Sequence, residues 1–587
     1  MVMENSLYET NSFPSAKKDE ILETLSRNYR DHFGTTPRIE ETNSWKASLD
    51  FLAGTIPSSV PVIMEYIFPL GLQRADLILL GHRIAHVVEI KGWASYREVD
   101  EYTCDTDLGE HIQPCYQLND YLSKFRNFHS ASRDFTFSGS VLMYNTRDGK
   151  SCDLIYNRQE FEDRLGALIR APAQKGDIDL ITGGKFIFSD TLVNFLKGHV
   201  GEMLKQPTKA LVSSGFGFSE NQMLIFQKIL RSIGGRRRVF LVKGRIGTGK
   251  TLLAVSILFN AISANKYGFL TYRNNRLIYT LRRAFGIASE FLKFYSMGPR
   301  GNFMGVAEKN FRTDDLERPP DFMIYDEAQR MTRENIRIGM TRAPITVFFF
   351  DEDQILNGME EGTETNFADT AKSMGLEYET MEMTSTFRMR FGDRVDRFIE
   401  SIWSEPLLPP PDGYLFRIES SMDELIRDLS DFMNERKKVA LLASWTESSG
   451  KEGDKIRVRN PRIEWLMDPS TEYPSYWIDQ KDALTKCASV YGSQGFEADY
   501  AGFIWGKDLV WRGKWDVIPE NIYDNMGGRQ SLQSVAKRDR EKARELLINR
   551  ANILLSRGIM GTLVYFEDEE TGKHLKSLLS AARSPHT

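Results

Sequence analysis

The sequence predicts an α/β protein with several domains. The chain has 587 residues, enough for roughly two to four domains of ordinary size. Short apolar runs alternate with stretches that carry apolar residues at helical spacing, and one such run leads into a helical pattern through a glycine-rich octapeptide. Runs of this kind, too short for buried helices, are typical of strands in a sheet that helices cover on both faces.

The N-terminal block, residues 1–200, mixes strand and helix patterns and is expected to form one domain. Apolar residues at helical spacing predict a first helix over 18–34. A second helix is expected around Trp45. Further along, apolar runs predict strands at 60–68, 75–80, 85–90 and 138–145, with a helix at 112–127.

The remainder of the chain alternates strands with helices in the βα manner of a parallel sheet. The preceding stretch 205–219 is rich in Gly, Ser and Lys and is expected to be a linker. We therefore expect a domain at 1–200, a linker at 201–215, a lobe at 216–382 and a second lobe at 383–587.

The octapeptide Gly244–Thr251 matches the pattern G-x-x-x-x-G-K-[ST] of nucleoside triphosphatase phosphate loops. Its apolar flanks supply the strand and the helix that this loop requires. Backbone N–H groups of such a loop surround phosphate oxygens, and the helix N-terminus adds partial positive charge. We expect Lys250 to reach the β- and γ-phosphates and Thr251 to ligate Mg²⁺. The other loop residues expected to bind the nucleotide are Gly244, Gly247, Thr248 and Gly249.

Two carboxylates, Asp326 and Glu327, end an apolar strand downstream of the loop. At the carboxyl end of a parallel strand such acids face the ligand crevice. Asp326 is expected to hold Mg²⁺, and Glu327 to orient and deprotonate the attacking water. After the next strand, Gln354 can hydrogen-bond the γ-phosphate or that water.

Two arginines of the second lobe, Arg388 and Arg557, are expected to close on the phosphates. Arginine suits this role because its guanidinium stays protonated and donates in a fixed fork.

The series of motifs resembles superfamily 1 helicases over about residues 216 to 570, and is closest to a bacterial helicase group related to schlafen proteins. The resemblance implies two RecA-like lobes with ATP between them and a strand of nucleic acid as partner. It also implies that Gln222, in Ser219–Gln222, reads adenine, and that Glu497 contacts the ribose.

The N-terminal domain carries a second acidic pattern. Strand alternation places Glu89 and Lys91 on one face, and if the two strands pair as a hairpin, Asp76 can meet them. Two carboxylates can hold a divalent cation, and a lysine beside them can activate water against a phosphodiester. The pattern resembles the PD-(D/E)XK nuclease superfamily over about residues 40 to 150. Gln117 and Tyr121 match the Q-x-x-x-Y of its exonuclease-like branch. The resemblance implies Mg²⁺, with Mn²⁺ as an alternative, on Asp76 and Glu89.

Composition limits the remaining choices. A net charge of -5 argues against a uniformly basic nucleic-acid coat but leaves room for a local basic groove. The four cysteines are far apart with no C-x-x-C pair, so we expect neither a zinc site nor a disulfide framework, and a reducing cytoplasm suits them. No apolar run is long enough to predict a membrane span. Tyr272 and Tyr491 could stack on bases or belong to the core.

These patterns together predict an ATP-dependent nuclease–helicase that acts on nucleic acid, with single-stranded DNA favoured. The bacterial resemblance implies a role in defence against phage, with homo-oligomers or a defence partner protein as further associations. Two alternatives remain open. One is a regulatory NTPase switch whose N-terminal domain binds nucleic acid without cleaving it, and the other is an RNA-processing enzyme.

Overall fold

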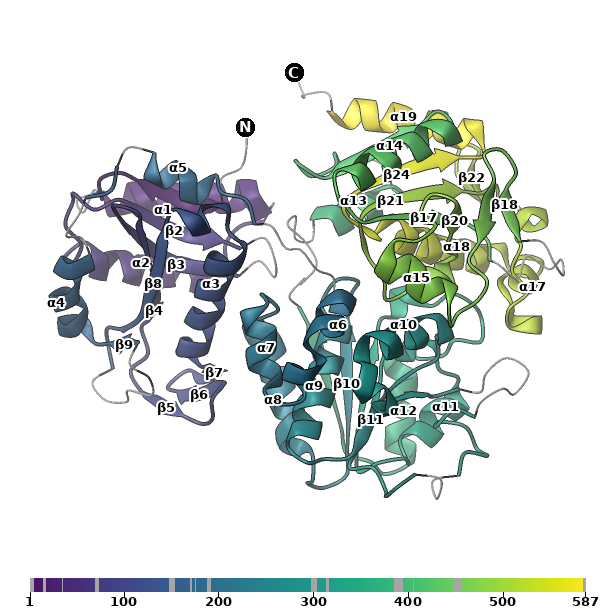
Figure 1. The fold of residues 1–587 in the computed structure, drawn as a ribbon, viewed down its shortest axis with the longest axis horizontal. Helices are drawn as coiled ribbons and strands as arrows, with labels where there is room; N and C mark the ends of the chain where they lie inside the picture. The colour runs from purple at the N-terminus through teal and green to yellow at the C-terminus, as the bar shows by residue number, and fades with distance from the viewer. Residues whose placement is uncertain are drawn as a thin grey trace. The chain divides into compact units, whose positions relative to one another are not determined.

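The computed structural model shows an α/β chain that divides into two compact units (Figure 1). It describes residues 5–13, 17–33, 35–68, 73–146, 152, 154–168, 172–174, 176–186, 192–296, 304–312, 316–384, 394–404, 406–446 and 455–583. The first unit takes in residues 1–189 and 206–228, and the second residues 190–205, 229–386 and 393–587. The fold class expected from the sequence is confirmed.

The first unit is built on a mixed sheet with the strand order β1-β2-β3-β4-β8-β9. The strands are β1 (Ser6–Thr10), β2 (Val62–Ile67), β3 (Arg74–Gly81), β4 (Ile84–Lys91), β8 (Thr136–Met143) and β9 (Ile155–Tyr156). The first four pair antiparallel, whereas β4, β8 and β9 are parallel. The expected strands and helices of this region are present within a few residues of their predicted bounds.

Helices cover both faces of this sheet because the apolar side chains of β3 and β4 alternate between two cores. On one face, Ile78 and Val87 pack with α3 (Pro114–Phe128) and α5 (Asp177–Thr182). On the other, Leu77 and Val88 pack with α1 (Lys18–Phe33), α2 (Ile39–Leu52) and α4 (Arg158–Leu168). A small antiparallel sheet of β5 (Tyr96–Glu98), β6 (Thr103–Thr106) and β7 (Gly109–Ile112) joins β4 to α3.

The stretch expected to be a linker is largely helical. It contains the end of α6 (Leu192–Met203) and all of α7 (Pro207–Ser213). Helix α7 is held against α3, where the Ser123 hydroxyl donates to the Val212 carbonyl at 2.9 Å and the Asn127 amide to the Ser213 carbonyl at 3.0 Å. Proline at the first turn of α7 suits a helix start, which outweighs the Gly/Ser content of the stretch.

The second unit contains two parallel sheets, as expected of two RecA-like lobes. The first has the order β12-β11-β13-β14-β10-β15. Its strands are β10 (Arg238–Gly244), β11 (Gly268–Tyr272), β12 (Leu292–Phe294), β13 (Phe322–Tyr325), β14 (Ile345–Phe350) and β15 (Tyr378–Met383). The helices of this part are α8 (Glu220–Ser232), which begins in the first unit, α9 (Lys250–Ser263), α10 (Asn275–Phe285), α11 (Arg333–Gly339) and α12 (Glu364–Ser373).

The second parallel sheet has the order β16-β24-β21-β17. Its strands are β16 (Leu415–Glu419), β17 (Val439–Ala443), β21 (Ala498–Trp505) and β24 (Gly558–Phe566). The helices are α13 (Arg394–Ser401), α14 (Met422–Asn434), α15 (Glu472–Asp479), α16 (Val490–Ser493), α17 (Leu532–Ala536), α18 (Arg540–Leu555) and α19 (Glu569–Arg583). Short strands β18 (Ile456–Val458), β19 (Ile463–Trp465), β20 (Lys486–Cys487), β22 (Leu509–Trp511) and β23 (Trp515–Val517) complete this lobe.

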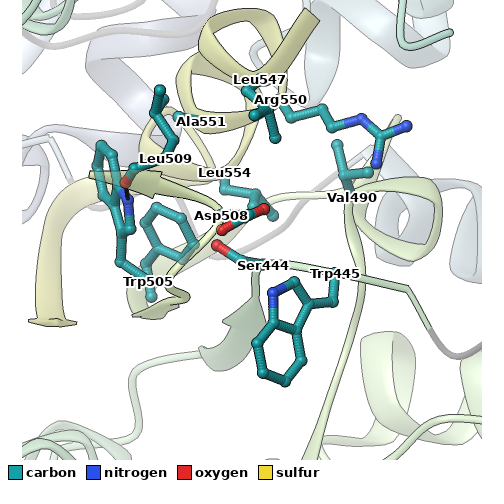
Figure 2. A pocket seen from close by; sticks show the side chains of 11 residues that line it. Ser444, Trp445, Val490, Trp505, Asp508, Leu509, Leu547, Arg550, Ala551 and Leu554 are labelled. Carbon is teal, nitrogen blue, oxygen red and sulfur yellow. Dashed lines mark hydrogen bonds between the residues drawn. The ribbon is translucent and has the colours of Figure 1, made fainter. Parts of the chain in front are cut away.

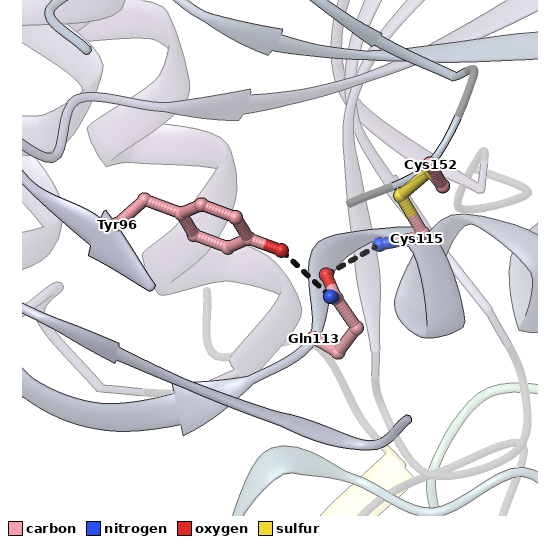
Figure 3. The surroundings of a disulfide bond; sticks show 4 residues. All are labelled: Tyr96, Gln113, Cys115 and Cys152. Atoms are coloured by element: carbon pink, nitrogen blue, oxygen red, sulfur yellow. Dashed lines mark hydrogen bonds between the residues drawn. A yellow bond between two sulfur atoms is a disulfide. The ribbon is translucent and has the colours of Figure 1, made fainter. Parts of the chain in front are cut away.

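A disulfide joins Cys115, in the first turn of α3, to Cys152 (Figure 3). The sequence predicted reduced cysteines with no disulfide framework, and for this pair that prediction is wrong. Sequence spacing could not reveal the pair, because 37 positions separate two cysteines that the fold brings to a Cα–Cα distance of 6.8 Å. The side chain of Gln113 accepts from the Cys115 N–H and caps the same helix turn. Cys104 and Cys487 are free thiols in the core.

Tyr272 and Tyr491 are both fully buried, so of the two interpretations of these residues the core one is confirmed. Within the described ranges, none of the helices has both the length and the apolar character that a membrane span needs.

Candidate functional site

The phosphate loop connects β10 to α9 at the carboxyl edge of the first parallel sheet. Gly247 and Gly249 have φ values of 79° and 81°, the left-handed region that glycine adopts without strain. A side chain at Gly244 would meet the Thr248 hydroxyl at 2.5 Å, so the loop can close tightly only with glycine there. The Lys250 amine lies along the loop and donates to the carbonyls of Gly244 and Arg245 at 2.6 and 2.8 Å.

The two acids after β13 lie beside this loop. The Thr251 hydroxyl donates to Asp326 Oδ2 at 2.8 Å, so the loop threonine and the strand-end carboxylate are in direct contact. Burial raises the pKa of Asp326, the neighbouring Glu327 carboxylate raises it further, and the Thr251 hydrogen bond opposes both. A carboxylate and a hydroxyl oxygen at this spacing suit Mg²⁺, which takes oxygen ligands and is held in part by substrate phosphates.

Glu327 is held in a fixed orientation. Its backbone has a φ of 54°, which is uncommon for a residue with a side chain, and its carboxylate accepts from the Gln329 amide at 2.6 Å. Gln329 Oε1 in turn accepts the Asp351 N–H at 3.4 Å. Such a carboxylate is placed to orient a water molecule as a general base.

Gln354 lies on the same edge, after β14. Its amide donates to Asp351 Oδ2 at 2.6 Å, and the same oxygen lies 3.6 Å from the Lys250 amine. The structure therefore brings together Lys250, Thr251, Asp326, Glu327 and Gln354 along one sheet edge, as the sequence predicts.

The structure describes only one of the two arginines that are expected to close on the phosphates. Arg388 lies outside the described residues. Arg557 is 1% exposed, and its guanidinium donates to the Ser493 and Phe496 carbonyls of its own lobe at 3.3 and 3.1 Å. The role of Arg557 at the phosphates stays a prediction.

Two other arginines link the lobes, and the sequence interpretation passed over both. Arg330 of the first lobe pairs with Glu360 at 3.1 Å and donates to Gln494 of the second lobe at 3.0 Å. Arg550 on α18 donates to the Leu356 carbonyl, two residues after Gln354, at 2.8 Å. Arg330 directly follows the motif Asp326–Gln329, and this position in the sequence could have identified it as a candidate site residue.

Tyr491 lies between these arginines. Its hydroxyl accepts from Arg550 and from Asn357, each at 3.1 Å, and donates to Asp524 at 3.3 Å. Both guanidinium carbons lie over the ring, at 5.1 Å for Arg330 and 5.4 Å for Arg550. We call this set the interlobe cluster; it comprises Arg330, Asn357, Glu360, Tyr491, Gln494, Asp524 and Arg550. The cluster joins the loop after Gln354 to α18 by direct hydrogen bonds.

The structure shows where the two residues expected to contact adenine and ribose lie, but not those contacts. Gln222 lies in the first unit, at the start of α8, where it exchanges hydrogen bonds with Ser219 in a capping box. Glu497 is half-buried and directly precedes β21. Their contacts with adenine and ribose stay predictions.

The acids of the first unit meet on the face of the sheet that α3 covers. Pairing of Leu77 with Val88 sets Asp76 across from Glu89, and Asp76 Oδ2 accepts the N–H of Ile90 at 2.6 Å. Lys91 Nζ lies 2.7 Å from Glu89 Oε1. Glu89 is 1% exposed, and its Oε2 is buried with no hydrogen-bond partner.

Helix α3 adds the two residues predicted from the Q-x-x-x-Y pattern. The Lys91 amine donates to Gln117 Oε1 at 3.3 Å, and the Gln117 amide donates to the Tyr121 hydroxyl at 2.7 Å. That hydroxyl donates to the Arg74 carbonyl at 2.9 Å. A continuous chain of contacts therefore runs from Glu89 through Lys91 and Gln117 to Tyr121.

A third carboxylate, Glu65, belongs to this acidic group. It has a φ of 52°, and it interrupts the alternation of β2, because Ile63 and Tyr66 face the same core. Its carboxylate pairs with Arg74 at 2.7 Å. Burial raises the pKa of Glu65 and of Glu89, and the charge of Asp76 raises both further.

This donor set fits a divalent cation. Lys91 pairs with one oxygen of Glu89, which leaves the unpartnered Glu89 Oε2 and the adjacent Asp76 carboxylate with more negative charge than one lysine neutralises. Excess buried charge of this kind is costly unless a further cation is bound. In the described part of the chain, no group of three or more His, Cys, Asp or Glu side chains is arranged to hold a metal alone. Two carboxylates completed by substrate oxygens and water are the usual arrangement for Mg²⁺.

Comparison with known families places the second unit. Residues 237–568 match the model described as Schlafen group 3, DNA/RNA helicase domain. The chain belongs to this family. The matched span runs from the strand before the phosphate loop to the last strand of the second lobe, so it includes the nucleotide site and the interlobe cluster of this Schlafen group 3 domain.

Individual proteins show weaker likeness. The chain is 24% identical over 397 residues to an uncharacterized protein of Saccharomyces cerevisiae, a match that covers 57% of this chain and 83% of the yeast protein. Two solved structures of the Arterivirus nonstructural protein 10 helicase, one in complex with DNA, are 11% identical, with a TM-score of 0.26 and 60% of this chain covered. The chain spans 64% and 65% of the length of those two helicase chains.

Proposed function

We propose that the second unit is an ATP-driven motor that moves along nucleic acid. The contact between Thr251 and Asp326 carries the proposal, because it joins the phosphate loop and the acidic strand end into one Mg²⁺–nucleotide site. Lys250 would bind the β- and γ-phosphates, and Glu327 would take a proton from the attacking water. The family's description as a DNA/RNA helicase domain supports this assignment.

We propose further that residues 1–200 form a phosphodiesterase domain. A divalent cation held by Asp76 and Glu89 would polarise the scissile phosphate and lower the pKa of bound water. Lys91, positioned by Gln117, would hold a phosphate oxygen, and Tyr121 would fix Gln117. Cleavage adds water across one P–O bond, and the proton released from the water ends on the leaving oxygen or on solvent.

The remaining parts of the proposal rest on the sequence, some on composition and some on the family resemblance. They are a linker near 201–215, lobes at 216–382 and 383–587, single-stranded DNA as the favoured strand, a cytoplasmic setting, and a role in phage defence as homo-oligomer or with a partner protein. Contacts of Gln222 and Glu497 with the nucleotide, and of Arg388 and Arg557 with its phosphates, also belong here.

One experiment tests both active sites. The full-length protein is incubated with plasmid and with single-stranded DNA, with and without Mg²⁺ and ATP, and both phosphate release and DNA cleavage are measured. We expect Lys250→Ala to lose ATP hydrolysis, and Glu89→Gln to lose Mg²⁺-dependent cleavage while it keeps ATP hydrolysis. Glu98→Gln, a substitution at an exposed acid of β5, serves as the control and should change neither.

Two results would contradict the proposal. Cleavage that persists in Glu89→Gln would remove the assigned cutting site and leave a regulatory NTPase as the better description. ATP hydrolysis that responds to neither single-stranded DNA nor single-stranded RNA would remove the motor.

A further inference from the structure

A small cavity lies in the second lobe, at the carboxyl ends of β17 and β21 (Figure 2). Helix α18 supplies Leu547, Arg550, Ala551 and Leu554 to its wall, and the strands supply Phe503 and Trp505. The cavity has a volume of about 20 Å³. The wider empty space around it totals about 320 Å³, part of which is open solvent. The cavity itself has room for about one oxygen-sized group.

Two buried polar atoms at this cavity have no hydrogen-bond partner. They are Oδ1 of Asp508 and the indole Nε1 of Trp445. Asp508 is 5% exposed, so its carboxylate is cut off from bulk water. Buried polar atoms are nearly always paired, and each exception needs an explanation such as a missing ligand.

The two atoms face the same small space. Both atoms lie close to Gly506: a Cβ added to that residue would meet Trp445 Nε1 at 2.9 Å and Asp508 Oδ1 at 3.0 Å, so the two atoms are near one another. Figure 2 shows the indole nitrogen and the carboxylate directed toward one region beside Ser444. The Ser444 hydroxyl is the third polar group there, and it accepts the Gly506 N–H at 3.0 Å. The two unpartnered atoms are therefore near neighbours at one cavity, where a single oxygen held between them would contact both.

The chemistry of the pair restricts the ligand. An ammonium group would satisfy Asp508 but leave the Trp445 donor unpaired, and an anion would satisfy Trp445 but be repelled by Asp508. A nucleobase is too large for the enclosed space. A hydroxyl group fits on both counts, because it donates one hydrogen bond and accepts others.

We propose that this cavity binds the 2′-hydroxyl of a single-stranded RNA that crosses the second lobe. The inference rests on the proposed motor function. The 2′-hydroxyl is the group by which a protein distinguishes RNA from DNA. Carboxyl ends of parallel strands are where open α/β sheets bind ligands. The inference favours RNA, against the expectation of DNA drawn from the sequence.

The residues around the cavity are held in place in a way that suits binding of an RNA strand. Ser444 and Trp445 are the half-buried residues of the lining, whereas the others are buried. Trp445 is fixed there, because its backbone has a φ of 77° and the Arg457 guanidinium lies 4.0 Å from its ring centroid. Arg457 is itself held by both oxygens of Glu567. The donor is thus held in position before a strand arrives.

The test measures the affinity of the full-length protein for fluorescent twelve-nucleotide strands that differ only at the 2′ position. Oligouridine, its 2′-deoxy form and its 2′-fluoro form are compared by fluorescence polarisation. The 2′-fluoro strand keeps an RNA-like sugar but cannot donate to Asp508. One or two lost hydrogen bonds predict binding of both analogues about three- to thirtyfold weaker than oligouridine.

Two variants locate the effect. Trp445→Phe removes the N–H but keeps the ring against Arg457, and Asp508→Leu removes the acceptor. Both should bring RNA affinity down to that of the deoxy strand and leave the affinity for the deoxy strand unchanged. Trp403→Phe is the control, because that indole already donates to Asn552 at 2.7 Å, and it should keep the RNA preference.

Several outcomes would overturn the proposal. Equal affinity of the wild-type protein for the three strands means that the cavity holds only a water molecule. A parallel loss of RNA and DNA affinity in Trp445→Phe means a purely structural role. Failure of the proposed function is a separate result, because no strand of either kind would then stimulate ATP hydrolysis.

Discussion

The two acidic sites of this protein are built on opposite sheet geometries. In the first parallel lobe, Asp326 and Glu327 follow the end of β13 and meet the phosphate loop at the sheet edge. In the N-terminal sheet, Asp76 and Glu89 lie within two antiparallel strands and meet across the ladder on the face that α3 covers. The two lysines differ as well: Lys250 donates to loop carbonyls, whereas Lys91 pairs with Glu89.

This difference explains why the site at the phosphate loop was easier to predict from sequence than the N-terminal site. A strand-end motif is contiguous in sequence, because the loop that carries it also carries the chemistry. A site on a sheet face is assembled by register, and a shift of one residue would turn every one of its side chains to the opposite face. The N-terminal site therefore depends on pairing that a single sequence shows only in part.

The largest effect is expected from the lysine of the N-terminal site. Lys91→Ala should lower Mg²⁺-dependent cleavage by roughly 100-fold or more, as removal of a charge-stabilising donor does at other active sites. ATP hydrolysis should be unchanged, which separates the two lysines. A cleavage assay beside a phosphate-release assay checks this, with Arg97→Ala, an exposed cation on β5, as control. Equal loss of both activities would show that the two sites are not independent.

The next effect concerns the interlobe cluster. Arg550→Ala leaves the buried Asp524 carboxylate without the guanidinium that neutralises it, and breaking a buried ion pair costs about 3–5 kcal/mol. We expect a lower thermal midpoint and slower nucleic-acid-stimulated ATP hydrolysis, with nucleotide affinity retained. Calorimetry and nucleotide titration measure these quantities. Arg544→Ala removes a half-buried arginine of the same helix and should change neither the thermal midpoint nor the stimulated hydrolysis. An equal loss there would assign the effect to α18 in general.

A smaller effect is expected from two tyrosine substitutions on α3, which distinguish a role in positioning Gln117 from a role in stability alone. Tyr121→Phe breaks the hydrogen bonds to Gln117 and to the Arg74 carbonyl and should cost about 1–3 kcal/mol. Cleavage should also fall, because Gln117 then holds Lys91 less firmly. Tyr116→Phe, on the same helix, loses a bond to the Phe218 N–H and should lower stability alone. If both variants cleave equally well, the Q-x-x-x-Y pattern has only a structural role.

The smallest effect is a pH dependence of stability without metal. Burial and the Asp76 charge raise the pKa of Glu89 above its ordinary value. The folded state therefore binds that proton more tightly, and its stabilisation is present at low pH and is lost as pH rises toward the raised pKa. In EDTA the thermal midpoint should fall from pH 5 to pH 9. Mg²⁺ should restore it at high pH, because the cation replaces the proton.

The Glu89→Gln variant provides the control for this measurement. It carries no proton to lose, so its midpoint should fall less over the same pH range and should gain less from Mg²⁺. A wild-type midpoint that rises with pH in EDTA would contradict the assignment of the raised pKa.

The sequence alone was sufficient for the α/β class, for the phosphate loop and for the strand-end acids, because these depend on local order: an apolar run, a glycine loop, a helix. It also placed Asp76, Glu89 and Lys91 in one group by alternation. It did not reveal the Cys115–Cys152 disulfide, the interlobe arginines or the placement of Asp508 and Trp445 at one cavity. These features join residues remote in sequence, and only the packing of strands and helices determines which buried polar groups find partners and which are left facing an open space.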